Sequence, residues 1–364
     1  MIRTRKTIGI AVVSVMAVSV TALWPGAGAA WAVSDGQLGL PAYPKAYYHG
    51  GHGAHASSAA DPRQTLHAGS EDGASADLAA VLHRARPGAV IVVYPGAYTA
   101  GPLIVKKPVS LVAAPGTSAT LRPDGTRACV EIDVEPGTRV EIVGLAFAPP
   151  AHGSRTAPCI ESRGADLRLV DVRIEASGLL PAVIIHGGEA WIESSDISGG
   201  ETGLVLGGEP FGSHILIGSR ISGNTGDGLR VGPGARVIAA DNVFAGNGRA
   251  GISDTGGSGL YSHNDIAGNG TGVLLHGADG DGPGPLFSAN DISGNRGAGV
   301  EARPGAQGVV AGNCIHGNGG AGIADYSGRV AQRPPNYFLG NGDMTDLGRR
   351  EARAVEEAFG AACR

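Results

Sequence analysis

A short motif ending in Gly-Asn recurs along the second half of the chain and limits the possible folds more than any other feature. Each copy ends in Gly-Asn, except the first, which ends in Gly-Gly, and an apolar residue lies two positions before this final pair. These apolar residues are spaced by 24, 23, 22, 26 and 23 positions: Ile197, Ile221, Phe244, Ile266, Ile292 and Ile315. A second series of apolar residues, which we call the second apolar column, has one member after each motif and recurs with a similar period: Leu204, Leu229, Ile252, Val273, Val300 and Ile323. Two columns with one period indicate a structural repeat.

A period of 22 to 26 residues is compatible with few repeat architectures. Leucine-rich repeats have this length, but they need several leucines in each unit, which these units lack. Helical repeats need longer units with fewer glycines, and a propeller blade is about twice as long. A β-solenoid coil needs short strands joined by turns rich in Gly, Asn, Asp and Ser, and the 62 glycines of the chain suit such turns. The repeat therefore predicts an all-β parallel β-helix.

The asparagines of the motif have a structural explanation. Neighbouring coils of a β-solenoid lie about 4.8 Å apart, so equivalent residues stack on one another. Asparagine tolerates left-handed turn conformations, and its amide can bond to the coils above and below. We predict a ladder of stacked side chains with no catalytic role: Asn224, Asn247, Asn269, Asn295 and Asn318.

The chain divides into four regions. Residues 1–32 are typical of a signal peptide, because a basic start and an apolar run are followed by small residues suited to cleavage. Residues 33–74, rich in Gly, Ala, Ser and His, indicate a flexible leader. We assign residues 75–340 to the β-helix and residues 341–364 to a C-terminal capping helix and tail. A short helix over residues 75–83 and the C-terminal helix, beginning at Asp346 and ending near Phe359, would cover the open ends of the solenoid.

Charge narrows the range of partners. Cleavage of the signal would remove Arg3, Arg5 and Lys6 and change the formal net charge from −5 to −8. A chain this acidic, with no cluster of Lys and Arg, is a poor ligand for nucleic acid or anionic lipid. A membrane anchor is the alternative to a signal peptide, but the apolar run is short and is followed by cleavable residues. We expect a secreted monomer with no stable membrane insertion after cleavage.

Four cysteines follow the signal, and an even number in an exported chain indicates disulfide bonds. Three pairings are possible. Cys129 and Cys159 each precede a residue that continues the second apolar column, so stacked coils would bring their Cα atoms to about 5 Å. We predict the bond Cys129–Cys159, and Cys314–Cys363 then follows by elimination.

The beginning of the expected β-helix resembles the entry coils of the pectate-lyase-like superfamily. The resemblance rests on Ala89-Val-Ile-Val-Val-Tyr-Pro-Gly-Ala-Tyr98, Leu103-Ile-Val-Lys-Lys-Pro-Val-Ser-Leu111 and Ala114-Pro-Gly116. The carbohydrate-binding and sugar-hydrolase group, which includes alginate C5-epimerases and nitrous-oxide-reductase accessory proteins of the NosD type, is the most similar, and the Gly-Asn coils resemble its repeats. The resemblance covers about residues 75–335 and implies a single-stranded right-handed parallel β-helix.

The catalytic motifs of these proteins are missing from the chain. The Asp-Pro-His-Asp motif of the epimerases and the Trp-Ile-Asp-His motif of pectate lyases are absent. Of the polygalacturonase motifs only Gly51-His52-Gly53 is present, in the leader, and the pectinesterase-like Pro95-Gly-Ala-Tyr-Thr-Ala100 lacks its glutamate. No catalytic residue can be transferred, and this fold hosts unrelated functions.

A ligand of a β-helix would lie along an exposed sheet, so the outward positions beside the second apolar column are candidate site residues. A C-terminal patch contains His276, Arg303, Tyr326, Glu301 and Arg230. Polyuronate β-elimination or C5 epimerisation needs a cation beside the carboxylate, a base for the C5 proton and an acid for the other face. Arg303 or Arg230 could be the cation, His276 the base and Tyr326 the acid. A solvated face with incidental ion pairs is the alternative.

Two further clusters could carry chemistry. A second candidate patch contains Glu131, Asp133, Glu161, Arg163 and His186. Carboxylates about two coils apart would suit inverting hydrolysis, which needs about 6.5–9.5 Å between them, or could hold calcium. The leader histidines His49, His52 and His55 could bind copper or zinc, and the surface turn at Asp279 and Asp281 could be a weak calcium loop. No other cofactor is expected.

These features leave three functions open. The first is a secreted β-helix that binds or processes an acidic extracellular polysaccharide or envelope glycan, as a polyuronate lyase or C5-epimerase. The second is a non-catalytic scaffold that binds a glycan, the cell wall or a protein. The third, implied by the NosD resemblance, is an envelope copper-handling accessory protein. Trp191 is the only tryptophan after the signal, so stacking on neutral sugars is poorly supported and acidic sugars are favoured.

Overall fold

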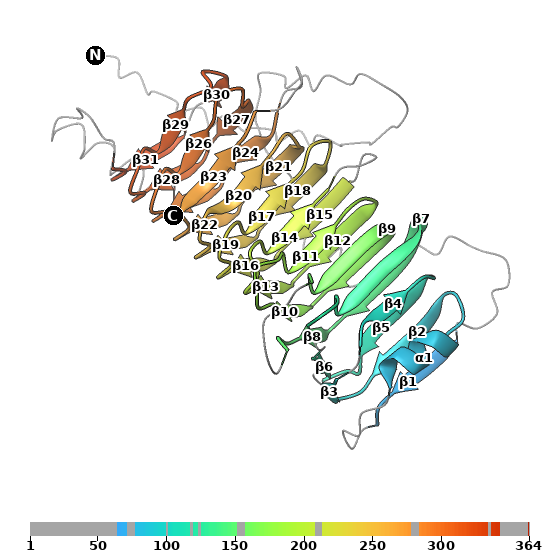
Figure 1. Ribbon diagram of the computed structural model, residues 1–364. Helices are drawn as coiled ribbons and strands as arrows, with labels where there is room; N and C mark the ends of the chain where they lie inside the picture. The colour runs from blue at the N-terminus through green and yellow to red at the C-terminus, as the bar shows by residue number, and fades with distance from the viewer. Residues whose placement is uncertain are drawn as a thin grey trace, which may run out of the picture. The chain divides into compact units, whose positions relative to one another are not determined.

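Three rows of short parallel strands, stacked coil upon coil, form the part of the chain that the structure describes (Figure 1). The computed structural model describes residues 64–70, 77–99, 101–116, 119–122, 125–150, 157–207, 213–277, 284–333, 336–342 and 363. These residues contain one helix, α1 (Leu78–Arg84), which is much too short to cross a membrane. The expected signal peptide, most of the leader and the helix expected over residues 346–359 lie outside the described residues.

The first face of the β-helix carries the second apolar column of the repeat. Its strands are β4 (Leu103–Val105), the beginnings of β7 (Val130–Val143) and β9 (Ile160–Val170), β11 (Val183–Ile185), β14 (Leu204–Leu206), β17 (Leu229–Val231), β20 (Ala250–Asp254), β23 (Thr271–Leu275), β26 (Val300–Ala302) and β29 (Ile323–Asp325).

The second face begins two strands earlier, with β1 (Thr65–Ala68) and β2 (Ala89–Val93), and includes the ends of the two long strands β7 and β9. The others are β5 (Val109–Ala113), β12 (Glu189–Glu193), β15 (Ser213–Ile217), β18 (Arg236–Ala240), β21 (Ser258–Ser262), β24 (Leu286–Ser288), β27 (Gly308–Ala311) and β30 (Val330–Arg333).

The third face carries the apolar residues of the Gly-Asn motif. Its strands are β3 (Gly96–Tyr98), β6 (Ala119–Leu121), β8 (Leu145–Phe147), β10 (Arg173–Glu175), β13 (Asp196–Ser198), β16 (Arg220–Ser222), β19 (Val243–Ala245), β22 (Asp265–Ala267), β25 (Asp291–Ser293), β28 (Cys314–His316) and β31 (Tyr337–Leu339). Every strand pairing on the three faces is parallel and joins strands one coil apart, so the predicted parallel β-helix is confirmed.

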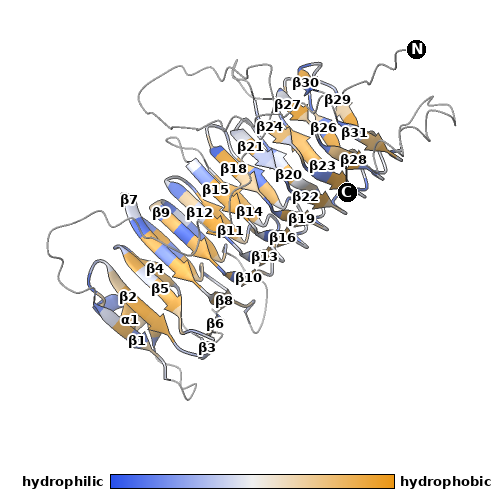
Figure 2. Cartoon of the chain, turned by 180° about the vertical axis from the view of Figure 1, so that it is seen from behind, coloured by the Kyte–Doolittle hydropathy of each residue, from blue (hydrophilic) through white to orange (hydrophobic). Residues whose placement is uncertain are grey.

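Both predicted apolar columns point into the solenoid. The third-face column from Ile197 to Ile315 is fully buried, and so is the first-face column from Leu204 to Val300. Alternation along each strand puts the intervening residues outside, because successive side chains of a strand point to opposite sides. Figure 2 shows mostly hydrophobic strands at β2 and β5 and hydrophilic stretches along β7 and β9.

The predicted asparagine ladder is present and continues to Asn341. Asn247 is typical of its members: its backbone N–H and its side-chain Nδ2 both donate to Asn269 Oδ1, at 2.9 Å each. Its Nδ2 also donates to the carbonyl oxygen of Ile221 in the preceding coil. The members are buried, so these bonds satisfy amides that have no access to water. The left-handed residue of each turn is the glycine before the asparagine, such as Gly246, and not the asparagine itself as we expected.

A second ladder, which the sequence analysis missed, closes the corner between the second and third faces. Its members lie two positions before the apolar residues of the motif: Asn242, Asn264, Asn290, Asn313 and Asn336. Asn264 donates from its backbone N–H and from Nδ2 to Asn290 Oδ1, at 3.0 and 2.9 Å. Ser195 and Ser219 extend the same row toward the N-terminus with hydroxyl groups.

A column of glycines beside the first ladder is explained by close approach. A Cβ atom at Gly272 would lie 2.6 Å from Ile292 Cγ2 and 2.9 Å from Asn295 Nδ2. Equivalent collisions would occur at Gly228, Gly251 and Gly299. The ladder amide, together with the core isoleucine or a backbone carbonyl oxygen, leaves no room for a side chain, which is why glycine lies at or next to the beginning of each first-face strand in this part of the chain.

The helix α1 packs against β1, β2 and β4 near the N-terminal end of the solenoid. Asp77 caps the helix by accepting a bond from the N–H of Ala80, and Lys107 Nζ donates to carbonyl oxygens at its C-terminal end. Leu78, Val81 and Leu82 are buried. We expected the leader to extend to residue 74, but β1 already pairs with β2 at residues 65–68, because its alternating residues Leu66 and Ala68 join the core.

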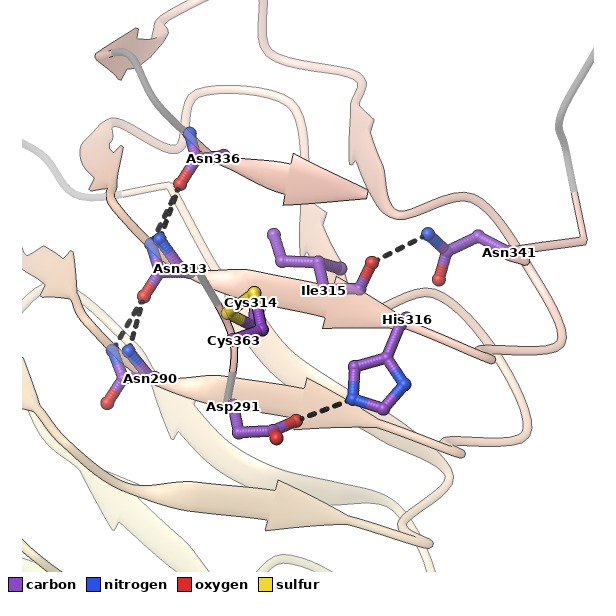
Figure 3. The surroundings of a disulfide bond; sticks show 9 residues. All are labelled: Asn290, Asp291, Asn313, Cys314, Ile315, His316, Asn336, Asn341 and Cys363. Atoms are coloured by element: carbon purple, nitrogen blue, oxygen red, sulfur yellow. Dashed lines mark hydrogen bonds and ion pairs between the residues drawn. A yellow bond between two sulfur atoms is a disulfide. The ribbon is translucent and has the colours of Figure 1, made fainter. Parts of the chain in front are cut away.

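Both disulfide bonds have the predicted pairing. Cys129–Cys159 joins the coils of β7 and β9, with the Cα atoms 4.8 Å apart and both side chains buried. Cys314–Cys363 has a Cα separation of 5.9 Å and ties residue 363 to the outward side of β28 (Figure 3). Beside it, His316 Nε2 lies 3.0 Å from Asp291 Oδ1, and the second asparagine ladder passes through Asn313.

Candidate functional site

The outward residues of the first face stack in two columns. In one column, Arg230 of β17, Ser253 of β20, Leu274 of β23 and Glu301 of β26 are register partners in consecutive coils. The second column lies just after the strands and contains His276, Arg303 and Tyr326. His276 N donates to the carbonyl of Asp254, Arg303 N to Leu275 and Tyr326 N to Ala302, so each residue occupies the same place in its own coil.

The structure therefore brings the predicted C-terminal patch together over adjacent coils. His276 Nε2 lies 3.4 Å from Ser253 Oγ, and Arg303 Nε lies 3.4 Å from Glu301 Oε1. Tyr326 is the most exposed of the group, with 69% of its surface accessible. Ser253 and Leu274 occupy outward positions of their strands but are buried. The longer polar side chains of the patch come from the positions around these two residues.

The surroundings of His276 favour its neutral form. Burial lowers the pKa of His276, and the positive charges of Arg303 and Arg249 lower this pKa further. Asp227 and Glu301 act on it in the opposite direction and do not cancel the effect. A neutral imidazole at neutral pH is able to accept a proton, which is the property a general base requires.

Two residues of this site, Asp227 and Arg249, were not predicted from the sequence. The Asp227 side chain has no exposed surface, and it lies in the turn before β17. Arg249 Nε donates to Asp227 Oδ1 and its Nη2 to Oδ2, at 2.7 Å each. Arg230 contacts the same carboxylate at 2.9 Å and also Glu201 at 3.1 Å. Arg230 is thus confined between two acidic groups, and Arg249 becomes the more accessible cation.

A sequence signal for Asp227 and Arg249 does exist. The residue directly before each first-face glycine is small or apolar in the neighbouring coils: Thr202, Ala250, Thr271 and Ala298. Asp227 replaces them in one coil only. The residue one position earlier is glycine in three coils, at positions 226, 270 and 297, but Arg249 in another. An alignment of the repeats could therefore have identified these two positions, because a charged residue there replaces the small residues of the other coils.

The second candidate patch is a network of ion pairs. Arg127 binds Glu131, with Nη2 2.5 Å from Oε2, and Glu161 accepts bonds from Arg163 and from His186 Nε2, the latter at 2.8 Å. We expected its carboxylates to lie about two coils apart. Glu131 and Glu161 are instead register partners on adjacent strands, so their coils are separated by only about 4.8 Å. This spacing and the basic partners do not match the separation that inverting hydrolysis needs.

Metal sites predicted from the sequence fall on other parts of the chain. His49, His52 and His55 and the turn at Asp279 and Asp281 lie outside the described residues. Within the described ranges no three His, Cys, Asp or Glu side chains are grouped so that they could hold a metal ion.

Comparisons with known proteins agree with this architecture. Residues 158–329 match the family model described as the right handed beta helix region. No curated protein matches the sequence. Pectate lyase Pel9A shares 17% sequence identity with a TM-score of 0.51, over 80% of this chain and 80% of that chain. The Dettilon tailspike protein gp208 shares 14% with a TM-score of 0.51, over 70% of this chain and 53% of its own.

An alginate lyase from Paenibacillus sp. str. FPU-7 is matched at 15% identity, with a TM-score of 0.45, over 76% of this chain and 98% of that chain. At such identities the likeness is one of fold. The fold of this protein is a right-handed parallel β-helix, as the entry coils and the Gly-Asn repeats predicted.

Proposed function

We propose that this protein is a secreted enzyme that acts on an acidic polysaccharide, by β-elimination or C5 epimerisation of a uronate, at the C-terminal patch of the first face. The observation that carries the proposal is the position of His276. This residue lies one coil before Arg303, and its surroundings, which include the charges of Arg303 and Arg249, favour the neutral form of its imidazole. The disulfide bonds support export, because such bonds persist in oxidising environments.

Both reactions begin with the same step. His276 would remove the proton from C5 of a uronate while an arginine neutralises the carboxylate, where negative charge develops. In β-elimination the bond from C4 to the leaving oxygen then breaks, a C4–C5 double bond forms, and Tyr326 gives a proton to the leaving oxygen. In epimerisation the C4–O bond stays intact and C5 receives a proton on its opposite face.

The columns of the first face suit a linear polymer. Equivalent residues recur about every 4.8 Å along the stack, so His276 and Tyr326 are about 10 Å apart at the backbone. Both residues occupy the same backbone position in their coils, directly after a first-face strand, and Tyr326 is largely exposed. A sugar unit placed between them would meet a base at one end and a phenol at the other.

The experiment is an assay of the mature protein against polygalacturonate, alginate and glucuronan. Unsaturated products are followed by ultraviolet absorbance, and inversion at C5 by proton NMR. We expect the variant His276→Gln to lose at least about 100-fold in rate, the usual contribution of a general base. His83→Gln, on the exposed end of α1, is the matched control and should retain full activity.

Acidity provides a second readout. A general base works in its unprotonated form, so the rate should rise with pH through the pKa of His276, which lies below the 6.5 of a free histidine. A rate that is unaffected by His276→Gln, or no reaction with any uronate polymer, would refute the proposed chemistry. Binding of a polymer without turnover would leave the non-catalytic scaffold as the function.

A further inference from the structure

A buried carboxylate stands where neighbouring coils have small residues. The Asp227 side chain is fully inaccessible to solvent, whereas alanine or threonine occupies its place at positions 202, 250, 271 and 298. Moving a carboxylate out of water is costly unless it is paired and hydrogen bonded. Because the adjacent coils stack with small residues at this position, closure of the coil does not explain the acidic group.

The partners of Asp227 indicate what it does. Its two oxygens accept a parallel pair of bonds from Arg249, and its Oδ1 lies 3.3 Å from the backbone N–H of Ala250. A bidentate pair of this kind fixes the plane of a guanidinium group as well as its position. The Arg249 side chain keeps 51% of its surface exposed, so a fixed cation is presented to solvent.

The other arginines of the site are held differently. Arg230 divides its donors between Asp227 and Glu201 and is only 29% exposed. Arg303 is as exposed as Arg249, at 52%, but its contact with Glu301 is from Nε to Oε1 at 3.4 Å, so that carboxylate does not fix its guanidinium group in a bidentate pair. Arg249 also acts electrostatically on His276, as do Arg303, Asp227 and Glu301. Arg249 directly precedes β20, the first-face strand that carries Ser253, and His276 Nε2 lies 3.4 Å from the Ser253 hydroxyl in the next coil.

We propose that Arg249 binds the carboxylate of an acidic sugar, and that Asp227 is a positioning residue that holds Arg249 in the orientation needed to place this sugar beside His276. The inference rests on the proposed function and identifies its carboxylate-binding group. A planar fork accepts a carboxylate in a way that a point charge does not, so geometry at Arg249 matters in addition to charge.

The first measurement is binding by isothermal titration with oligogalacturonate and oligomannuronate, and with a neutral cello-oligosaccharide for comparison. Arg249→Lys keeps the charge and removes the fork, and it should weaken binding of the acidic oligosaccharides by about tenfold or more, as expected for loss of a hydrogen bond to a charged group. Arg236→Lys, on the exposed second face, is the matched control and should bind as the wild type does. The neutral oligosaccharide should not distinguish the variants.

The second measurement needs no ligand. The pKa of His276 is followed by NMR in the wild type, Arg249→Gln, Arg249→Lys and Asp227→Asn. Removal of the Arg249 charge should raise this pKa, Arg249→Lys should leave it nearly unchanged, and Asp227→Asn should lower it because a negative neighbour is lost. Asp227→Asn should also weaken acidic-oligosaccharide binding although Arg249 is intact, and circular dichroism confirms that the variant is folded.

The outcomes separate the two proposals. If the wild type binds acidic oligosaccharides and Arg249→Lys binds them equally well, this inference is wrong, and the proposed function stands or falls with His276→Gln. If Arg249→Lys weakens binding while His276→Gln retains turnover, the carboxylate site is supported and the proposed base is wrong. Absence of any binding to acidic oligosaccharides by the wild type would overturn both.

Discussion

The two halves of the β-helix close their coils in different ways. From Ser195 onward, two rows of stacked side chains, mostly asparagines, form hydrogen bonds with the backbone groups at two corners of each coil. The strands of this half have three to five residues. In the preceding half, β7 with 14 residues and β9 with 11 run from the first face to the second without a break. These two strands cross the corner between the first and second faces, with a register shift between Asp133 and Thr138, whereas the ladders occupy the other two corners; a buried disulfide joins the same two coils.

This difference explains where a precise site can form. An amide ladder repeats only if each coil presents its corner residues in the same place, so the ladder half keeps strict register between coils. Asp227, Arg249 and His276 all belong to this half. The first half has longer connections between its strands, and the charged side chains on its outer surface form local ion pairs.

The largest effect should come from removing an interior rung of the first ladder. Asn269→Ala would orphan the buried backbone N–H of Asn247 and would remove one hydrogen bond each from Asn247 Nδ2 and from the carbonyl oxygen of Phe244. At about 1–3 kcal/mol for the orphaned group and about 0.5–1.5 kcal/mol for each of the other two lost bonds, we expect a loss of about 2–6 kcal/mol in the free energy of unfolding, measured by urea titration. Ser222→Ala, on the outward side of β16, is the control and should change stability by less than about 0.5 kcal/mol. A small loss in Asn269→Ala would show that the ladders do not hold this half together.

The next effect tests the first half. Replacing Cys129 and Cys159 together by alanine removes a bond between residues 30 apart in sequence, and we expect a cost of about 3 kcal/mol. Hydrogen exchange should show faster exchange in β7 and β9 and unchanged protection in the ladder half. The pair Cys314→Ala and Cys363→Ala provides the comparison, because that bond lies on the outward side of the last coils. Uniform loss of protection along the whole chain would mean that the halves unfold as one unit.

Much of this architecture could be predicted from the sequence, because period and alternation determine a solenoid. The core columns, the first ladder and both disulfide bonds follow from equal spacing, and the structure confirms them. The second ladder was missed because its asparagines follow a variable residue: the left-handed position before them is Asp241, His263, Ala289 or Gly312. Without a constant Gly-Asn pair the row is less visible, although its distance from the apolar residue is constant.

Site residues were predicted less completely, because spacing gives the direction of a side chain but not its partners. Register placed His276, Arg303 and Tyr326 in one column, as expected. Asp227 and Arg249 lie in the turns before β17 and β20, outside the outward columns of the first face. Their side chains bind each other, and both act on His276 through their charges. The distance between Glu131 and Glu161 was misjudged because the first half has no strict repeat to count along.

Acid should affect the ladder half through His214, which is buried in β15. Burial lowers its pKa, its Nε2 lies 3.0 Å from the carbonyl oxygen of Gly207, and its Nδ1 is buried without a partner. Below pH 6.5 the unfolded chain binds a proton at this histidine and the folded protein does not. Stability should therefore fall as the pH decreases from 6.5 toward the folded pKa, by at most about 1.4 kcal/mol for each pH unit.

The variant His214→Gln isolates this effect. It should flatten the dependence of the urea midpoint on pH between about 6.5 and 5, whatever its effect on stability at neutral pH. His83→Gln, which changes an exposed histidine of α1, should leave the slope as in the wild type. A slope that persists in His214→Gln would assign the acid sensitivity to another group.

The smallest effect should come from the ion pairs of the first half, and it bears directly on which half carries the function. Glu161 binds Arg163 and His186 on the surface, and the arginine side chain is 53% exposed. Exposed pairs of this kind contribute about 0–1 kcal/mol, so Glu161→Gln should change the free energy of unfolding by no more than that. It should also leave polysaccharide turnover unchanged, because the carboxylate lies five coils before His276 along the first face and is already paired with basic partners. A loss of turnover in Glu161→Gln comparable to that in His276→Gln would move the active site into the first half, and the strict register of the ladder half would then serve stability alone.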